Sequence, residues 1–117
     1  MSWVPLHVHS QFSILDSTAS IKMLAEKAAE FQMPALALTD QGNLHGAVDF
    51  FKACLAVGVK PIIGCELFVA PGLCTEKKKV SGQKPGYPIV LLAKNKEGYR
   101  SLCKLSSCAY LEGFYYT

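Results

Sequence analysis

The chain has 117 residues, the usual size of one domain, and half of them are hydrophobic, which is enough for a packed core. Charged residues make up only 18% of the chain, and this composition excludes an intrinsically disordered segment. The net charge of +3 is too small to indicate nucleic-acid binding by itself.

The five cysteines indicate a reducing compartment. Their number is odd and no C-x-x-C pair occurs, so neither a disulfide framework nor a zinc knuckle is predicted. The first residues lack the basic and apolar regions of a signal peptide, and no apolar run is long enough to span a bilayer. We therefore expect a cytoplasmic protein with no membrane contact.

The first half of the chain alternates between predicted strands and helices. Residues 3–8 predict a short strand, with Pro5 tolerable at an edge. A turn-rich loop follows, and Ser20 is a candidate N-cap for a helix. The core face of that helix is predicted from apolar residues at helical spacing: Ile21, Leu24, Ala25, Ala28 and Phe31. Residues 35–38 then predict a buried strand.

The second half continues the alternation. A second helix is predicted from Leu44, Ala47, Val48, Phe51 and Leu55, with Gly58 as its C-cap. Residues 61–71 predict a third strand, and the stretch 71–86, rich in glycine, proline and lysine, predicts a long surface loop. A fourth strand is expected at 87–94. A last helix is expected at 94–111, with one face formed by Tyr99, Leu102, Cys103, Ser106 and Tyr110.

This order predicts an α/β fold with a parallel sheet and helices packed on it. It fits either an open doubly wound sheet or part of a β/α barrel, and in both folds functional groups gather at the carboxyl ends of strands. Polar side chains stand at three successive strand ends of this chain. They are His7 and His9, then Asp40 and Gln41, then Glu66.

The H-V-H stretch predicts a metal site. Residues two apart in a strand point to the same side, so His7 and His9 are expected to converge. Asp16 follows seven residues after His9. Converging imidazoles and carboxylates are typical ligands of transition metals.

Four blocks of the sequence carry a resemblance to a known family. They read HVHSQFSILD, LALTDQGNLHGAVDFFKAC, GVKPIIGCELFVAP and IVLLAKNKEGYRSLCKLSSCAYLEGFYY. Together they resemble the polymerase and histidinol phosphatase (PHP) domain at the amino terminus of the alpha-subunit family of bacterial replicative DNA polymerase III. The resemblance implies that residues 1–117 are the N-terminal part of one distorted (β/α)7 PHP barrel, with about four βα units of parallel strands. It also implies that 71–86 is an exposed insertion, and that the rest of the barrel and the polymerase domains lie outside this chain.

The resemblance also implies a ligand set. The matching positions are His7, His9, Asp16 and Glu66, which would hold zinc, manganese or iron. The family usually carries histidine where this chain has Gln41, and an amide oxygen is a poor replacement for imidazole. Asp40 is expected to cap the second helix, with orientation of a ligand as its alternative role.

Because of Gln41, we expect the metal site to be degenerate and the domain to be a scaffold that docks a separate proofreading exonuclease subunit. The parent chain would be a Mg-dependent DNA-directed DNA polymerase whose partners are DNA, dNTPs, the sliding clamp and clamp-loader subunits. The chain alone would be inactive, and its open strand edge would favour self-association. The alternatives are an active metal-dependent 3′–5′ exonuclease, a standalone phosphoesterase and, more distantly, a β/α-barrel amidohydrolase.

Overall fold

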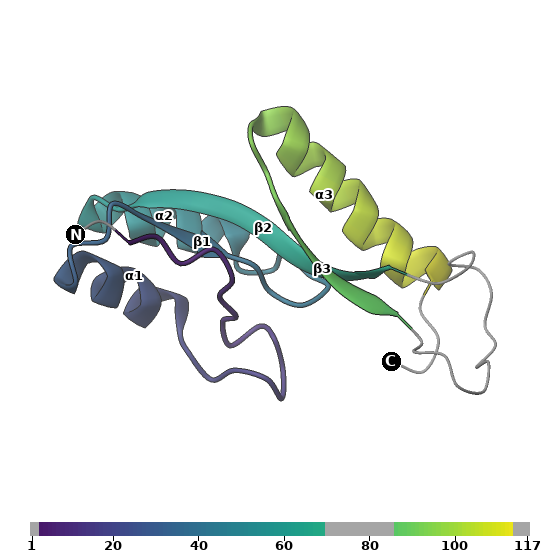
Figure 1. Ribbon diagram of the computed structural model, residues 1–117, viewed down its shortest axis with the longest axis horizontal. Helices are drawn as coiled ribbons and strands as arrows, with labels where there is room; N and C mark the ends of the chain where they lie inside the picture. The colour runs from purple at the N-terminus through teal and green to yellow at the C-terminus, as the bar shows by residue number, and fades with distance from the viewer. Residues whose placement is uncertain (1–2, 70–85, 114–117) are drawn as a thin grey trace.

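The computed structural model describes residues 3–69 and 86–113, and these form a mixed α/β fold (Figure 1). The sheet has the order β1-β2-β3, with β1 at Ala35–Leu38, β2 at Lys60–Val69 and β3 at Tyr87–Leu92. The helices are α1 at Ile21–Glu30, α2 at Ala47–Val57 and α3 at Lys96–Cys108, and a π-helical turn, η1, follows at Ala109–Gly113. Residues 71–85 of the predicted surface loop lie outside the described ranges.

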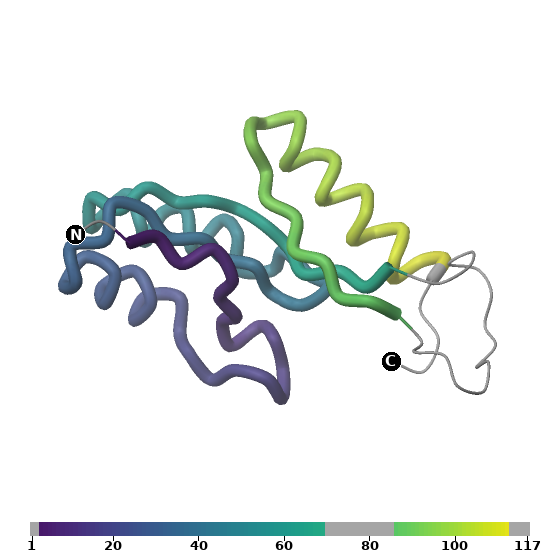
Figure 2. The backbone as a smooth tube through the Cα atoms, viewed as in Figure 1, coloured from purple at the N-terminus to yellow at the C-terminus, as the bar shows by residue number. Residues whose placement is uncertain are grey.

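The predicted first strand is wrong as a regular strand. Residues 3–9 run beside β1 in the same direction (Figure 2), and Ala37 and Thr39 donate backbone hydrogen bonds to the carbonyls of Pro5 and Val8. The two donors are two residues apart, but the two acceptors are three residues apart, so the register slips by one residue. Pro5 also has no N–H to donate, and a regular ladder therefore does not form.

The prediction that all strands are parallel is also wrong. β1 and β2 pair in parallel, but β3 pairs antiparallel to β2, with Gly64 opposite Leu92. A parallel pair needs a crossover connection, usually a helix, whereas antiparallel strands can be joined by a loop. No helix was predicted between these two strands, so the antiparallel direction was consistent with the sequence.

The core lies between the sheet and the pair α1 and α2. All four residues of β1 are buried, as predicted, because the N-terminal segment and β2 flank this strand. The predicted start of α1 is confirmed, since the Ser20 side chain accepts a hydrogen bond from the backbone of Met23. Of the predicted core face of α1, Ile21, Ala25 and Ala28 are buried, whereas Phe31 is exposed beyond the end of the helix.

The predicted core face of α2 is largely wrong. The helix begins at Ala47, later than expected, and its buried residues are Ala47, Phe50 and Cys54. Val48, Phe51 and Leu55 are about half exposed. The C-cap at Gly58 is confirmed, with a left-handed φ of 77°. This helix has apolar residues on two faces, so spacing alone could not tell which face the sheet covers.

The last helix stands apart from the other two and crosses over the end of the sheet (Figure 1). Asn95 caps α3 by accepting a hydrogen bond from the backbone N–H of Gly98. Leu102 is the buried member of its predicted face, and the Ser106 hydroxyl donates to the carbonyl of Gly42 at 2.9 Å. That bond attaches α3 to the loop that follows β1.

Candidate metal centre

Two imidazoles and one carboxylate converge at one point of the structure. His7 and His9 come from the extended N-terminal segment, and Glu66 comes from β2. Nε2 of His7 lies 3.1 Å from Oε2 of Glu66, and Nε2 of His9 makes a closer contact with the same oxygen. The donor atoms of the three side chains all lie within 4.8 Å of one another. The two-residue spacing in an extended segment explains why both imidazoles reach one carboxylate.

The cluster is partly open to solvent. The side chain of His7 is 54% exposed and that of His9 is 22% exposed, whereas that of Glu66 is 10% exposed. Burial alone would raise the pKa of the Glu66 carboxyl, but the hydrogen bonds and charge attraction of His7 and His9 outweigh it and lower that pKa. Glu66 is therefore a carboxylate at neutral pH, the protonation state that metal binding requires.

Gln41 faces the same cluster. It forms an isolated parallel bridge with Glu66, in which Glu66 N–H donates to the carbonyl of Asp40 and Gly42 N–H donates to the carbonyl of Glu66. Residues paired in this way present their side chains to the same face of the sheet. The side chain at position 41 is thus beside the site, and it offers an amide.

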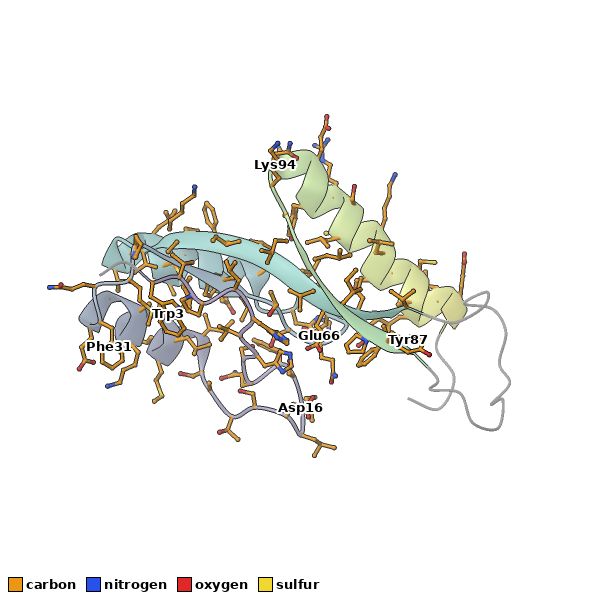
Figure 3. The ribbon with its side chains drawn as sticks, viewed as in Figure 1. Trp3, Asp16, Phe31, Glu66, Tyr87 and Lys94 are labelled. Carbon is orange, nitrogen blue, oxygen red and sulfur yellow. The ribbon has the colours of Figure 1, made fainter. Side chains whose placement is uncertain are left out.

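Asp16 lies apart from the cluster. It is exposed on the loop between the N-terminal segment and α1, as Figure 3 shows, and it is not among the side chains whose donor atoms converge. Its backbone N–H donates to the carbonyl of Ser13. The structure therefore brings together His7, His9 and Glu66, places Gln41 next to them, and leaves Asp16 outside.

Asp40 does not cap α2, and this part of the sequence prediction is wrong. The N-cap of α2 is Gly46, six residues further on. The Asp40 side chain is buried and accepts hydrogen bonds from Ser10 N–H at 2.6 Å, the Ser10 hydroxyl at 2.6 Å and the Ser13 hydroxyl at 2.8 Å. Asp40 therefore binds the loop that directly follows His9.

Hydroxyl groups around the cluster were missed by sequence reasoning. Ser10, Ser13 and Ser17 belong to the loop after His9, and Thr39 directly follows β1. One signal could have found the first two. A carboxylate directly after a fully buried strand needs donors, and a serine-rich loop next to a neighbouring strand supplies them.

The donor set fits a divalent transition metal. Two imidazole nitrogens and one carboxylate oxygen are ligands that zinc, manganese and iron accept, and their donor atoms lie within 4.8 Å of one another. Three protein ligands leave room for a water or a substrate atom. Among the described residues, this is the group of histidine, cysteine and acidic side chains close enough to hold a metal.

Comparison with known proteins identifies the family of this chain. The family model for the PHP domain matches residues 5–117. The chain belongs to the PHP-domain family. Two solved structures share the fold of this PHP chain: an amidohydrolase from Chromobacterium violaceum (TM-score 0.60, 22% identity, 86% of this chain and 32% of that chain) and a putative metal-dependent phosphoesterase from Bifidobacterium adolescentis (TM-score 0.57, 18% identity, 88% and 32%).

Several sequence relatives of the PHP chain carry the same name. DNA polymerase III subunit alpha of Chlamydia trachomatis is 60% identical over 116 residues, which cover 99% of this chain and 9% of that protein. The subunits of Treponema pallidum and Thermus aquaticus are 49% and 48% identical, over 99% and 98% of this chain and 10% of each protein. The chain thus spans about a tenth of the length of these relatives. Within the described ranges, none of its helices has the length and apolar character needed to cross a membrane.

Proposed function

We propose that this chain is the PHP portion of a bacterial replicative DNA polymerase III alpha subunit. Identity of 60% to the Chlamydia trachomatis subunit over nearly the whole chain supports this proposal. Templated synthesis from dNTPs on DNA, with Mg²⁺, would then be carried out by the remaining nine-tenths of such a protein. Its partners would include the sliding clamp and the clamp-loader subunits, in the cytoplasm.

Within that subunit, the PHP region is a scaffold with a reduced metal site. The observation that carries this proposal is the donor set. His7, His9 and Glu66 converge, but the neighbouring position on the same face is Gln41, which supplies an amide, and Asp16 stays outside. By itself, this set supplies ligands for one ion. A multi-metal centre that clamps a phosphate and activates water needs more ligands than these.

His7, His9 and Glu66 would each have a defined role in binding a divalent metal ion. His7 and His9 would bind it through Nε2, which requires that the proton on each ring move to Nδ1. Glu66 would supply the anionic oxygen that now accepts from both rings. A zinc, manganese or iron ion bound there supplies Lewis acidity and cross-links the N-terminal segment to β2.

The first test is the metal content of the full-length polypeptide, measured by elemental analysis after purification without chelators. We expect one ion or less per chain, lost in the His7→Ala/His9→Ala double variant and increased by Gln41→His. His45→Ala is the matched control, because His45 is exposed, packs edge-on against Phe12 and lies outside the cluster. Two or more ions per chain in the wild type would contradict a reduced site.

The scaffold role has its own test. The exonuclease subunit should co-purify with the wild-type polypeptide and with the His7→Ala/His9→Ala variant alike, and DNA 3′ ends should not be degraded without that subunit. Loss of binding in the double variant, while the His45→Ala control still binds, would show that the metal cluster itself forms the docking site.

A metal-dependent 3′–5′ exonuclease or a standalone phosphoesterase is the second candidate. The observation that favours it is the exposure of His7. This side chain is about half exposed, so a phosphate group could reach the cluster from solvent. A 3′–5′ nuclease activity that disappears in the double variant and rises in Gln41→His would establish this candidate. The length of the reading frame beyond Thr117 distinguishes a domain of a polymerase subunit from a standalone phosphoesterase. A standalone enzyme would end within one domain length.

The chain by itself is also expected to self-associate. Apolar side chains stay exposed on the described faces, among them Phe51, Leu55 and Ile89. In addition, β3 pairs with β2 along one edge and has no strand on its other edge within the described residues. Sedimentation of the 117-residue chain tests this, and a strict monomer at all concentrations would contradict it.

A further inference from the structure

The imidazoles of the candidate site are not held by a regular β-ladder. The segment 3–9 makes backbone bonds to β1 through the carbonyls of Pro5 and Val8, with a one-residue slip between them. In a regular parallel pair, evenly spaced bonds would fix every residue of the segment. Here other groups must set the position of the backbone around His9.

The first of these groups is Thr39. Its hydroxyl accepts a hydrogen bond from Val8 N–H at 2.9 Å and lies 3.3 Å from the Val8 carbonyl. The backbone N–H of Thr39 donates to the same carbonyl at 2.8 Å. Val8 stands between the two histidines, so Thr39 takes the place of the missing ladder at the centre of the H-V-H stretch.

The second group is the Asp40 carboxylate. One oxygen accepts from Ser10 N–H and the Ser13 hydroxyl, and the other accepts from the Ser10 hydroxyl. Asp40 is 1% exposed, and no ion pair with a cation is among those of the described residues. Three short bonds from one loop therefore satisfy this buried charge, and they attach the residue after His9 to the end of β1.

The third group is the Ser17 hydroxyl, which donates to the His9 carbonyl at 3.0 Å and accepts from Ala19 N–H at 3.2 Å. The peptide unit between His9 and Ser10 is thus held at both ends. Its carbonyl is bound by Ser17 and its N–H is bound by Asp40. Small rotations of this unit would swing the His9 ring away from Glu66, because the ring is attached directly next to it.

We propose that Asp40 and Ser17 are positioning residues for His9: they clamp the His9–Ser10 peptide so that Nε2 of His9 meets the Glu66 carboxylate. The inference rests on the proposed metal site for its consequence in binding, but the clamp itself is a property of the metal-free protein. Asp40 is not a ligand, because both of its oxygens are already engaged and its donor atoms are not among those that converge. Partners that orient a ligand typically change metal affinity by about 10–100-fold when they are removed.

The test uses two readouts on the full chain. The first is Zn²⁺ affinity, measured by competition with a chromogenic chelator. The second, measured in metal-free protein, is the rate at which diethyl pyrocarbonate modifies His9 relative to His45, determined by mass spectrometry. His45 is the internal reference because it is exposed and outside the clamp.

Three variants separate positioning from simple structural damage. Asp40→Ala removes all three acceptor bonds, and we expect Zn²⁺ affinity to fall by about 10–100-fold and the His9 to His45 rate ratio to rise. In Asp40→Asn, the Zn²⁺ affinity and the His9 to His45 rate ratio should both stay close to those of the wild type. The asparagine amide oxygen can accept from Ser10 N–H and the Ser13 hydroxyl, and its NH₂ can donate to the Ser10 hydroxyl. Ser17→Ala removes the bond to the His9 carbonyl, at the other end of the peptide, together with the bond from Ala19 N–H. It should change both readouts in the same direction as Asp40→Ala but by a smaller factor.

The possible outcomes test the clamp and the metal site separately. An unchanged His9 to His45 ratio in both Asp40→Ala and Ser17→Ala, in protein that keeps its far-UV circular dichroism, would overturn the clamp. If Asp40→Ala does not fold, Ser17→Ala and Asp40→Asn still give the ratio. Wild-type protein that binds no Zn²⁺, but shows the expected change in ratio, would overturn the proposed metal site and leave the clamp supported.

Discussion

Replacing Gly64 by alanine should destabilise the sheet and disturb the metal cluster together. Gly64 is buried in β2, two residues before Glu66, and it pairs with Leu92 of β3. A β-carbon at Gly64 would lie 2.7 Å from the backbone oxygen of Leu91, 2.8 Å from a methyl group of Leu92 and 2.9 Å from the methyl group of Thr39. All three distances are shorter than real β-carbon contacts.

These neighbours differ in how easily they move. The Leu92 methyl group ends a flexible side chain and can rotate away. The Leu91 oxygen belongs to the backbone of β3, and Thr39 is tied to Val8 through its hydroxyl, so neither moves without breaking hydrogen bonds. Forcing an extra methyl group into a packed site typically costs about 1–3 kcal/mol of unfolding free energy.

Gly58→Ala is the matched control for the same substitution. Nothing lies within 4 Å of a β-carbon at Gly58, but its φ of 77° disfavours any side chain. That strain costs about 1 kcal/mol, and it arises at the end of α2, away from the cluster.

Urea unfolding followed by far-UV circular dichroism gives the change in stability, and the His9 to His45 modification ratio reports on the cluster. Gly64→Ala should lower the free energy of unfolding and raise that ratio, because the inserted methyl group meets Thr39, which holds Val8 between the two histidines. Gly58→Ala should lower stability and leave the ratio unchanged. An unfolding midpoint for Gly64→Ala equal to that of the wild type would refute the reasoning.

Three further predictions follow from the same structure. Because the pKa of Glu66 is lowered, its stabilising contribution is present above the ordinary carboxyl pKa and is lost as pH falls through the lowered value. Glu66→Gln should therefore be about 1 kcal/mol less stable than wild type at neutral pH and equally stable in strong acid, as measured by urea unfolding at both pH values. Burial raises the pKa of Cys54 and of Cys65 to about 11, so stability should fall as pH rises above 9.0, the ordinary thiol value. For the same reason iodoacetamide should label neither thiol at mildly alkaline pH until the protein unfolds, and labelling of the folded protein would contradict their burial. Phe50→Ala should cost about 3–5 kcal/mol, because this ring is fully buried between the helices and the sheet. Its neighbour Phe51 is about half exposed, so Phe51→Ala should cost less than about 1 kcal/mol, and equal costs in thermal melts would show that the wrong face of α2 had been assigned to the core.

Local pattern in the sequence predicted several of the helices and strands. The helical spacing of apolar residues after Ser20 placed α1, and the short apolar run at 35–38 placed β1 within its observed bounds. Gly58 marked the end of α2 because a left-handed C-cap favours glycine. These features depend on residues within about two helical turns of one another, so they can be inferred without the tertiary structure.

The candidate site was predictable only in part. The H-V-H spacing predicted two converging imidazoles, and the structure brings them together with Glu66. Glu66 was expected at the end of its strand, but it lies inside β2, three residues before Val69. The ligand role of Asp16 and the metal itself stay predictions. What Asp40 does could not be inferred, because a carboxylate after a strand can cap a helix or bind a loop, and the choice depends on where residues some 30 positions away lie.

Only the tertiary structure decided three features of the chain. It set the antiparallel direction of β3, it chose Phe50 and Cys54 as the buried face of α2, and it joined Asp40 and Ser17 to the backbone around His9. The physical reason is common to all three. Periodicity tells which residues share a side of an element, but a helix with two apolar faces or a loop with several donors has more than one possible partner. The partner is selected by which surfaces and hydrogen bonds can be satisfied at the same time in the packed molecule.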